Sequence, residues 1–169
     1  MIYSSQVNLS RYQDDIIQCF TDNKLIFDSQ HRLNDNSNRD DILNYVYSFI
    51  QQKDCLVYGL FDNNKLYLYG LVMFENMRFG ENANCAQAHI ALSKLIWGET
   101  SFKLLQEILK DCIFDVVYCQ IPSRAVPAIR LAKKLGFKKT GYVPKCIPYV
   151  NSEGREILYD LFTLTWRKM

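Results

Sequence analysis

A histidine within an alternating strand pattern is the first residue of this sequence that suggests chemistry. The more polar face of this strand carries Gln87, His89, Ala91 and Ser93, with apolar residues between them. An imidazole can accept a proton near neutral pH, directly or through water. We therefore predict His89 as a general base. The alternative is a histidine whose ring only bonds a neighbouring side chain.

Proton donors are expected from a second strand. Tyr118 and Gln120 share one face of an apolar run, and Ser123 follows just past its end. Tyr118 or Ser123 can protonate a leaving group, although a packed ring and an ordinary helix cap are the alternatives. Glu75, at the end of a hairpin strand, is the second choice of base, with a solvated strand end as its alternative.

The stretch SKLIWGETSFKLL, residues 93–105, joins a strand to a helix and can bind an anion. Gly98 turns the chain, and Thr100 and Ser101 can cap the helix and offer hydroxyl groups. Backbone N–H groups at such a helix start suit a phosphate. Positive charge would come from Lys94 and Lys103. The alternative is a loop in which Trp97 simply packs.

The segment PSRAVPAIRLAKKLGFKKTG, residues 122–141, predicts a helix between two strands. Ser123 and Arg124 form a polar entry, and Lys133 and Lys134 lie near the end, where positive charge favours a helix. Gly136, followed by Phe137, is typical of a helix stop. The segment therefore indicates a strand, a crossover helix and a returning strand.

The elements that must position these residues follow from hydrophobic periodicity. Strands are expected over residues 1–5, 55–61, 65–74, 86–93, 115–121, 139–150 and 156–166, and helices over 9–20, 42–51, 102–112 and before Gly136. This order suits an α/β mixed sheet with helices on both faces and its central strands parallel. A ligand is expected between the strands that end near Ser93 and Ile121.

Composition limits the class of protein. With 169 residues, 49% of them hydrophobic and 22% charged, the chain is predicted to be a single globular domain over residues 1–169. A net charge of +2 gives no indication of nucleic-acid binding. No apolar run approaches the roughly 20 residues of a membrane span. The N-terminal residues lack a secretion signal, so a cytoplasmic protein is expected.

The cysteines are predicted to be structural thiols. No CxxC pair is present, and the sequence has only two histidines, so zinc-ligand spacing is lacking. Reduced cysteines in apolar runs act as small hydrophobic residues. The six are Cys19, Cys55, Cys85, Cys112, Cys119 and Cys146.

The run AIRLAKKLGF, residues 128–137, and the residues after it up to Gly141 resemble a segment of the GNAT N-acetyltransferases. The order of elements is also similar over most of the chain, and the chain is similar to compact members found among bacteriophage genes. The resemblance implies a mixed, mostly antiparallel sheet with one central parallel strand pair. It also implies acetyl-CoA as co-substrate.

The same resemblance implies which residues bind the coenzyme. Backbone groups of residues 92–94 would polarise the thioester, and the helix start near Gly98 would hold the pyrophosphate. The implied coenzyme-binding residues are Leu92, Ser93, Lys94, Trp97, Gly98, Glu99, Thr100, Ser101, Arg124, Ala125, Ala128 and Lys133.

The sequence departs from the family at two places. The family's pyrophosphate loop reads Arg/Gln-x-x-Gly-x-Gly/Ala, whereas the corresponding stretch here has the single glycine Gly98. Ala125 and Ala132 stand where many relatives have an Asn that contacts the pantetheine arm and a Tyr that acts as general acid. The usual proton donor is therefore missing.

Together these observations predict an N-acetyltransferase that moves an acetyl group directly from acetyl-CoA to a primary amine of a small molecule or protein. No nucleic-acid or membrane partner is expected, a homodimer is left open, and the location is the cytoplasm, of the host if the chain is viral. One alternative is a weakened relative that serves as a binding or assembly module, such as a phage structural or host-regulating protein. Another is an acetyltransferase toxin or anti-defence factor.

Overall fold

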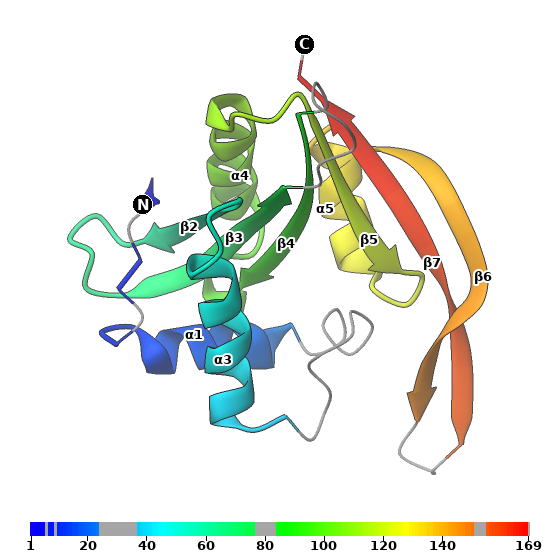
Figure 1. The fold of residues 1–169 in the computed structure, drawn as a ribbon, viewed down its shortest axis with the longest axis horizontal. Helices are drawn as coiled ribbons and strands as arrows, with labels where there is room; N and C mark the ends of the chain where they lie inside the picture. The colour runs from blue at the N-terminus through cyan, green and yellow to red at the C-terminus, as the bar shows by residue number, and fades with distance from the viewer. Residues whose placement is uncertain (6, 9, 24–36, 77–83, 151–154, 169) are drawn as a thin grey trace.

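A computed structural model describes residues 1–5, 7–8, 10–23, 37–76, 84–150 and 155–168. Its described residues form a seven-stranded sheet in the order β1-β2-β3-β4-β5-β7-β6 (Figure 1). The strands are β1 (Ile2–Ser4), β2 (Cys55–Phe61), β3 (Leu68–Asn76), β4 (Cys85–Leu92), β5 (Val116–Pro122), β6 (Lys138–Val150) and β7 (Glu156–Arg167). Only β4 and β5 run parallel in this sheet. The predicted fold class is confirmed.

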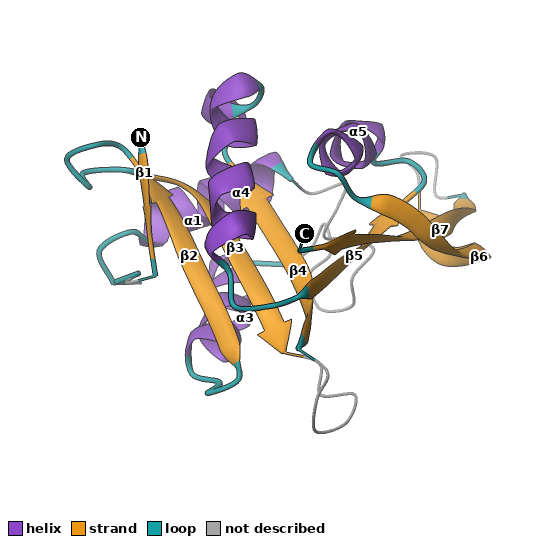
Figure 2. Ribbon diagram, turned by 90° about the horizontal axis from the view of Figure 1, so that it is seen from above, coloured by secondary structure: helices purple, strands orange, loops and turns teal. Residues whose placement is uncertain are grey.

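Helices cover both faces of the sheet (Figure 2). On one face α1 (Gln13–Asp22) and α3 (Arg39–Ile50) pack in a core that includes Met73 and Ala91. On the other, α4 (Glu99–Asp111) and α5 (Val126–Lys134) pack in a core that includes Ala88 and Leu92. The alternation predicted for β4 is therefore correct, because Ala91 lies in one core while Ala88 and Leu92 lie in the other.

The helix stop predicted at Gly136 is a Schellman motif. The N–H of Phe137 donates to the carbonyl of Ala132, and that of Gly136 donates to the carbonyl of Lys133, both at 3.0 Å. Gly136 has a φ of +93°, which a residue with a Cβ adopts only with strain. The segment thus ends α5 and turns the chain into β6, as the sequence indicates.

Helix α4 begins earlier than predicted. The sequence favoured a start at residue 102 with Thr100 or Ser101 as the cap. The structure places the N-cap at Gly98, with no side-chain capping hydrogen bond. Thr100 and Ser101 lie inside the first turn, because the N–H of Phe102 already donates to the Gly98 carbonyl at 3.1 Å. The capping role predicted for these hydroxyl groups is therefore wrong.

Strands β4 and β5 pair only briefly. Their register runs through Cys85–Val116, Ala86–Val117 and Gln87–Tyr118, and then stops. Beyond that point β4 remains paired with β3 up to Leu92, while β5 remains paired with β7 up to Pro122. The two strands consequently part toward their carboxyl ends.

No described helix is both long and apolar enough to span a membrane.

Helix α3 begins with a reciprocal capping box. The Asn38 side chain accepts from the N–H of Asp41 at 3.0 Å, and the Asp41 carboxylate accepts from the N–H of Asn38 at 2.9 Å. Asn38→Ala is expected to lower the free energy of unfolding by about 1 kcal/mol, since it leaves a helix N–H without this acceptor. Urea unfolding measures the change. The control is Asn64→Ala in the exposed β2–β3 turn, and equal losses in both variants would contradict the prediction.

The β2–β3 turn depends on an ionised carboxylate. Asp62 accepts from the N–H groups of Tyr67 at 2.8 Å, Asn64 at 3.2 Å and Leu66 at 2.7 Å. These bonds, that of Tyr67 first, lower the pKa of Asp62. Its stabilising effect is therefore present above the unfolded pKa of about 3.9 and is lost as the pH falls through the folded pKa.

Asp62→Asn is accordingly expected to be less stable than the parent chain near neutral pH, with a difference that closes as the solution is acidified below about pH 4. Urea unfolding across this range measures both curves. A difference that stays constant with pH would rule out ionisation of Asp62 as the cause.

Candidate functional site

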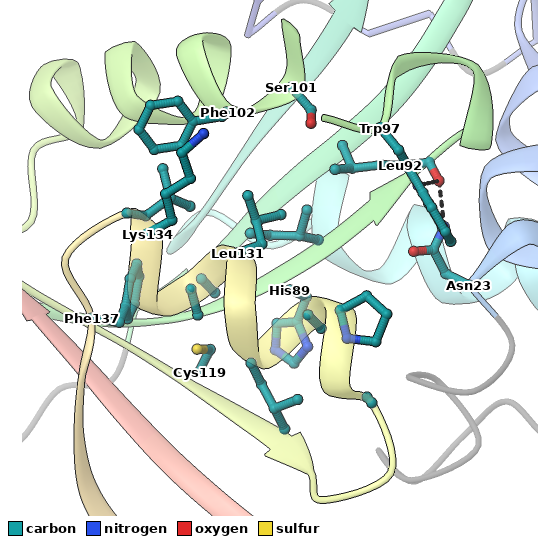
Figure 3. Close-up of a pocket in the computed structure, with 18 of the residues that line it drawn as sticks. Asn23, His89, Leu92, Trp97, Ser101, Phe102, Cys119, Leu131, Lys134 and Phe137 are labelled. Atoms are coloured by element: carbon teal, nitrogen blue, oxygen red, sulfur yellow. Dashed lines mark hydrogen bonds between the residues drawn. The ribbon is translucent and has the colours of Figure 1, made fainter. Parts of the chain in front are cut away.

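A cavity of about 390 Å³ lies where β4 and β5 part, between α4 and α5 (Figure 3). This is the position at which the sequence predicted a ligand, between the strands that end near Ser93 and Ile121. The cavity brings together predicted residues from three regions of the chain. Those that line it are His89, Leu92, Trp97, Gly98, Glu99, Ser101, Ala125 and Ala128.

The α5 wall of the cavity is built from small residues. Ala125, Ala128 and Ala132 recur at helical spacing and all line the cavity, facing Ala88 and Leu92 of β4. Ala125 and Ala132 are the positions that we aligned with an Asn and a Tyr in relatives. Alanine at both leaves this wall apolar and without a hydroxyl group.

The carbonyl of Leu92, a residue that lines the cavity, has two side-chain partners. It accepts a hydrogen bond from the indole N–H of Trp97 at 3.2 Å and another from the Asn23 side chain at 2.5 Å (Figure 3). Trp97 is about half exposed and also lines the cavity. Asn23, which the sequence analysis missed, carries no local signal because its partner lies on a distant strand.

Two backbone N–H groups predicted to polarise a thioester are already engaged. That of Ser93 donates to the Tyr69 carbonyl at 2.8 Å, and that of Lys94 donates to the Asp22 carboxylate at 2.8 Å. Neither Ser93 nor Lys94 lines the cavity. These N–H groups are therefore not available to a ligand carbonyl in this structure.

The start of α4 presents both glycine and charge to the cavity. Gly98 has a φ of +111°, and nothing lies within 4 Å of the position that a Cβ would occupy. Ser101 is buried and donates to the Gly98 carbonyl at 3.0 Å, whereas Thr100 is exposed and lies outside the cavity lining. Of the two predicted hydroxyl groups, only that of Ser101 reaches the cavity.

A lysine and a glutamate from different helices meet at the cavity. Lys134 Nζ lies 3.0 Å from Glu99 Oε2 and 4.1 Å from the centre of the Phe102 ring. The hydrogen bond from Lys134 lowers the pKa of Glu99. The sequence analysis assigned Lys133 to the coenzyme, but the lysine that lines the cavity is Lys134. Spacing along the helix alone did not distinguish these neighbours.

His89 lies at the parting of the strands, on the α3 side of the sheet. It is 8% exposed, its Nε2 lies 3.7 Å from Glu75 Oε2, and its ring lies 5.1 Å from the Phe49 ring. Glu75 is 41% exposed. The structure thus places the two predicted bases next to each other, with the histidine bordering the cavity and the carboxylate facing solvent.

Tyr118 lies next to a residue that lines the cavity, Cys119, but does not line the cavity itself. Its hydroxyl donates to Gln87 Oε1 at 3.1 Å, and the register aligns Glu75, Gln87 and Tyr118 in one row across β3, β4 and β5. Burial, with smaller contributions from Cys85 and Glu75, raises the pKa of Tyr118. The phenol therefore stays protonated near neutral pH, but Tyr118 itself does not line the cavity.

Ser123 and Arg124 face β7 instead of the cavity. The Ser123 N–H donates to the Asp160 carbonyl at 2.8 Å, and the Asp160 N–H donates to Ser123 Oγ at 3.3 Å. The Arg124 guanidinium lies 5.3 Å from the centre of the Tyr159 ring. Neither residue is part of the cavity lining, because these contacts extend the junction of β5 with β7.

Cys119 was predicted to be a structural thiol, yet it also lines the cavity. Burial raises the pKa of this thiol to about 12, so it is neutral at physiological pH. Among the described residues, no group of three or more His, Cys, Asp or Glu side chains is arranged to hold a metal ion.

The architecture of this chain is similar to that of solved structures, although no sequence comparison finds a match. No protein-family model matches the chain, and no curated protein sequence does. Solved structures do: spermidine N-acetyltransferase from Vibrio cholerae, in complex with CoA and spermine, aligns with a TM-score of 0.71 at 15% identity, over 98% of this chain and 94% of that one. Ribosomal-protein-alanine N-acetyltransferase from Brucella melitensis aligns with a TM-score of 0.68 at 12% identity, over 99% and 100%.

A GNAT-family acetyltransferase from Streptococcus pneumoniae also aligns over 99% of both chains, with a TM-score of 0.63 at 13% identity. At such identities the likeness concerns the fold. The element order, the one parallel strand pair of the described sheet and these alignments agree with the resemblance seen in the sequence. The chain therefore has the fold of the GNAT N-acetyltransferases.

Proposed function

We propose that this chain is an N-acetyltransferase that binds acetyl-CoA between α4 and α5 and transfers the acetyl group directly to a primary amine. The observation that carries the proposal is the cavity of about 390 Å³ at the parting of the only parallel strand pair in the described sheet. A pocket at such a point, at the carboxyl ends of parallel strands, is where α/β sheets bind ligands. The structural neighbours are themselves N-acetyltransferases, one of them in complex with CoA.

The acyl donor would lie along the apolar wall. Ala125, Ala128 and Ala132 leave room beside α5, and Leu131 and Phe137 add apolar surface. A flexible pantetheine arm suits such a channel, because its methylene groups are buried while its amides can bond the backbone edges of β4 and β5 that no longer pair. The thioester would then lie near the point where the strands part.

The acceptor would approach from the side of His89. In the proposed reaction the amine nitrogen attacks the thioester carbonyl, the C–S bond breaks and the amine proton passes to His89 Nε2, directly or through water. Glu75, 3.7 Å from that nitrogen, stabilises the imidazolium that forms. The departing thiolate takes a proton from water, because Tyr118 lies outside the cavity lining and Ser123 faces β7. The imidazolium of His89 then gives the amine proton to the hydroxide that remains, which restores the neutral base.

A non-catalytic binding module is the second candidate. The alanine at position 132 and the engaged N–H groups of Ser93 and Lys94 remove the proton donor and the carbonyl-binding donors expected at this site. Such a module could keep the cavity while having lost turnover. Both candidates can bind the acyl donor, and they differ in whether the acetyl group is transferred.

Filling the cavity should abolish donor binding. Ala128→Phe adds a ring to the α5 wall, and we expect it to weaken acetyl-CoA binding at least tenfold in isothermal titration calorimetry, because the ring occupies the donor's space. Arg130→Phe, two residues on and exposed, is the control and should bind like the parent chain. Equal affinity in the two variants would place the donor elsewhere.

Removing the imidazole should impair chemistry and spare binding. We expect His89→Ala to lower kcat about a hundredfold while the Kd for acetyl-CoA stays within about twofold, measured by release of CoA thiol with spermidine and with an alanine-terminated peptide as amine probes. Unchanged turnover would exclude His89 as the base.

Glu75→Gln tests the same base through the pH profile. Removing a carboxylate 3.7 Å from the ring makes the imidazolium less stable, so the acidic limb of kcat should move to lower pH. An unchanged pH dependence of kcat would show that Glu75 does not influence the proton transfer.

A further inference from the structure

One ion pair joins the two helices that border the cavity. Lys134 belongs to the last turn of α5 and Glu99 to the first turn of α4, and Nζ lies 3.0 Å from Oε2. Both residues line the cavity, yet their side chains are 55% and 61% exposed. The pair therefore lies at the mouth of the cavity, where solvent and ligands reach it.

Lys134 can supply a positive charge at the mouth of the cavity. Among the described residues that line the cavity, it is the one with a permanently cationic side chain. Its ammonium group also lies 4.1 Å from the centre of the Phe102 ring, which favours a fixed position for the charge (Figure 3). Lys94, in contrast, is directed to Asp22, with Nζ 3.8 Å from Oδ1.

Glu99 occupies the place that a ligand anion would take on this lysine. The hydrogen bond and charge of Lys134, with a smaller effect of Lys103, lower the pKa of Glu99, so the side chain is an anion at neutral pH. An exposed single ion pair is weak because water competes with it. A phosphate group, with more charge and more acceptor oxygens, binds a lysine more strongly than one carboxylate does.

We propose that Lys134 binds a phosphate group of the acyl donor and that Glu99 is a built-in competitor, which the phosphate must displace before the donor can occupy the cavity. The proposal rests on the proposed function, since it assigns a contact within the same donor site. It makes Glu99 a residue that weakens donor binding. Donor affinity would thus be set in part by an anion of the protein itself.

Calorimetry with CoA and with pantetheine, which lacks phosphate, tests the proposal. Glu99→Gln should tighten CoA binding about three- to tenfold by freeing Lys134, and Lys134→Gln should weaken it about tenfold. Pantetheine affinity should change in neither variant. The controls are Glu107→Gln on exposed α4 surface and Arg130→Gln one turn before Lys134, which should bind CoA like the parent chain.

The possible outcomes are distinct. CoA affinity that is unchanged or lower in Glu99→Gln, or pantetheine affinity that changes in parallel with CoA affinity, would overturn the role of Glu99 while leaving the proposed function intact. Equal CoA affinity in Lys134→Gln and Arg130→Gln would overturn the role of Lys134. Detectable CoA binding in Glu99→Gln, with none in the parent chain, would support the proposal. Absence of CoA binding in the parent chain and in every variant would overturn the proposed function and this inference together.

Discussion

The short pairing of β4 with β5 is the constraint on which the candidate site depends. Three residue pairs join these strands, ending at Gln87–Tyr118, while each strand keeps its other neighbour to its end. Because β4 stays hydrogen-bonded to β3 and β5 stays hydrogen-bonded to β7, the two halves of the sheet diverge while each strand remains paired on its other side. Beyond Gln87 and Tyr118, residues of both strands line the cavity instead of pairing with each other.

The divergence also places the proposed site between two otherwise separate cores. One core lies between the sheet and α1 and α3, the other between the sheet and α4 and α5. A continuous sheet would separate a donor beside α5 from His89 on the α3 side. At the parting of the strands the histidine borders the cavity that α5 lines. In the proposed reaction, donor and acceptor would therefore meet there from opposite faces of the sheet.

Local patterns in the sequence predicted the fold well. Alternation along residues 86–93 placed Ala91 and Leu92 in the correct cores, and Gly136 marked the end of α5 at the residue where φ becomes positive. These features depend on near neighbours, which a single sequence displays. The start of α4 was missed because Thr100 and Ser101 are good caps by type, whereas the positive φ at position 98 gives Gly98 the role.

The details of the site were harder to predict because they depend on distant segments. Whether Ser123 faces the cavity or β7 is decided by its two hydrogen bonds with Asp160. Lys134, not Lys133, lines the cavity, where it meets Glu99 of a different helix. Asn23 bonds a carbonyl that is 69 residues away in sequence. Tertiary contacts of this kind leave no mark in local periodicity.

A crystal structure of the chain grown in an excess of acetyl-CoA would show whether the cavity is the donor site. We expect the pantetheine arm between α4 and α5, its thioester at the parting of β4 and β5, and a phosphate group on Lys134. Coenzyme bound on another face of the sheet, or a cavity left without coenzyme at saturating concentration, would contradict this expectation.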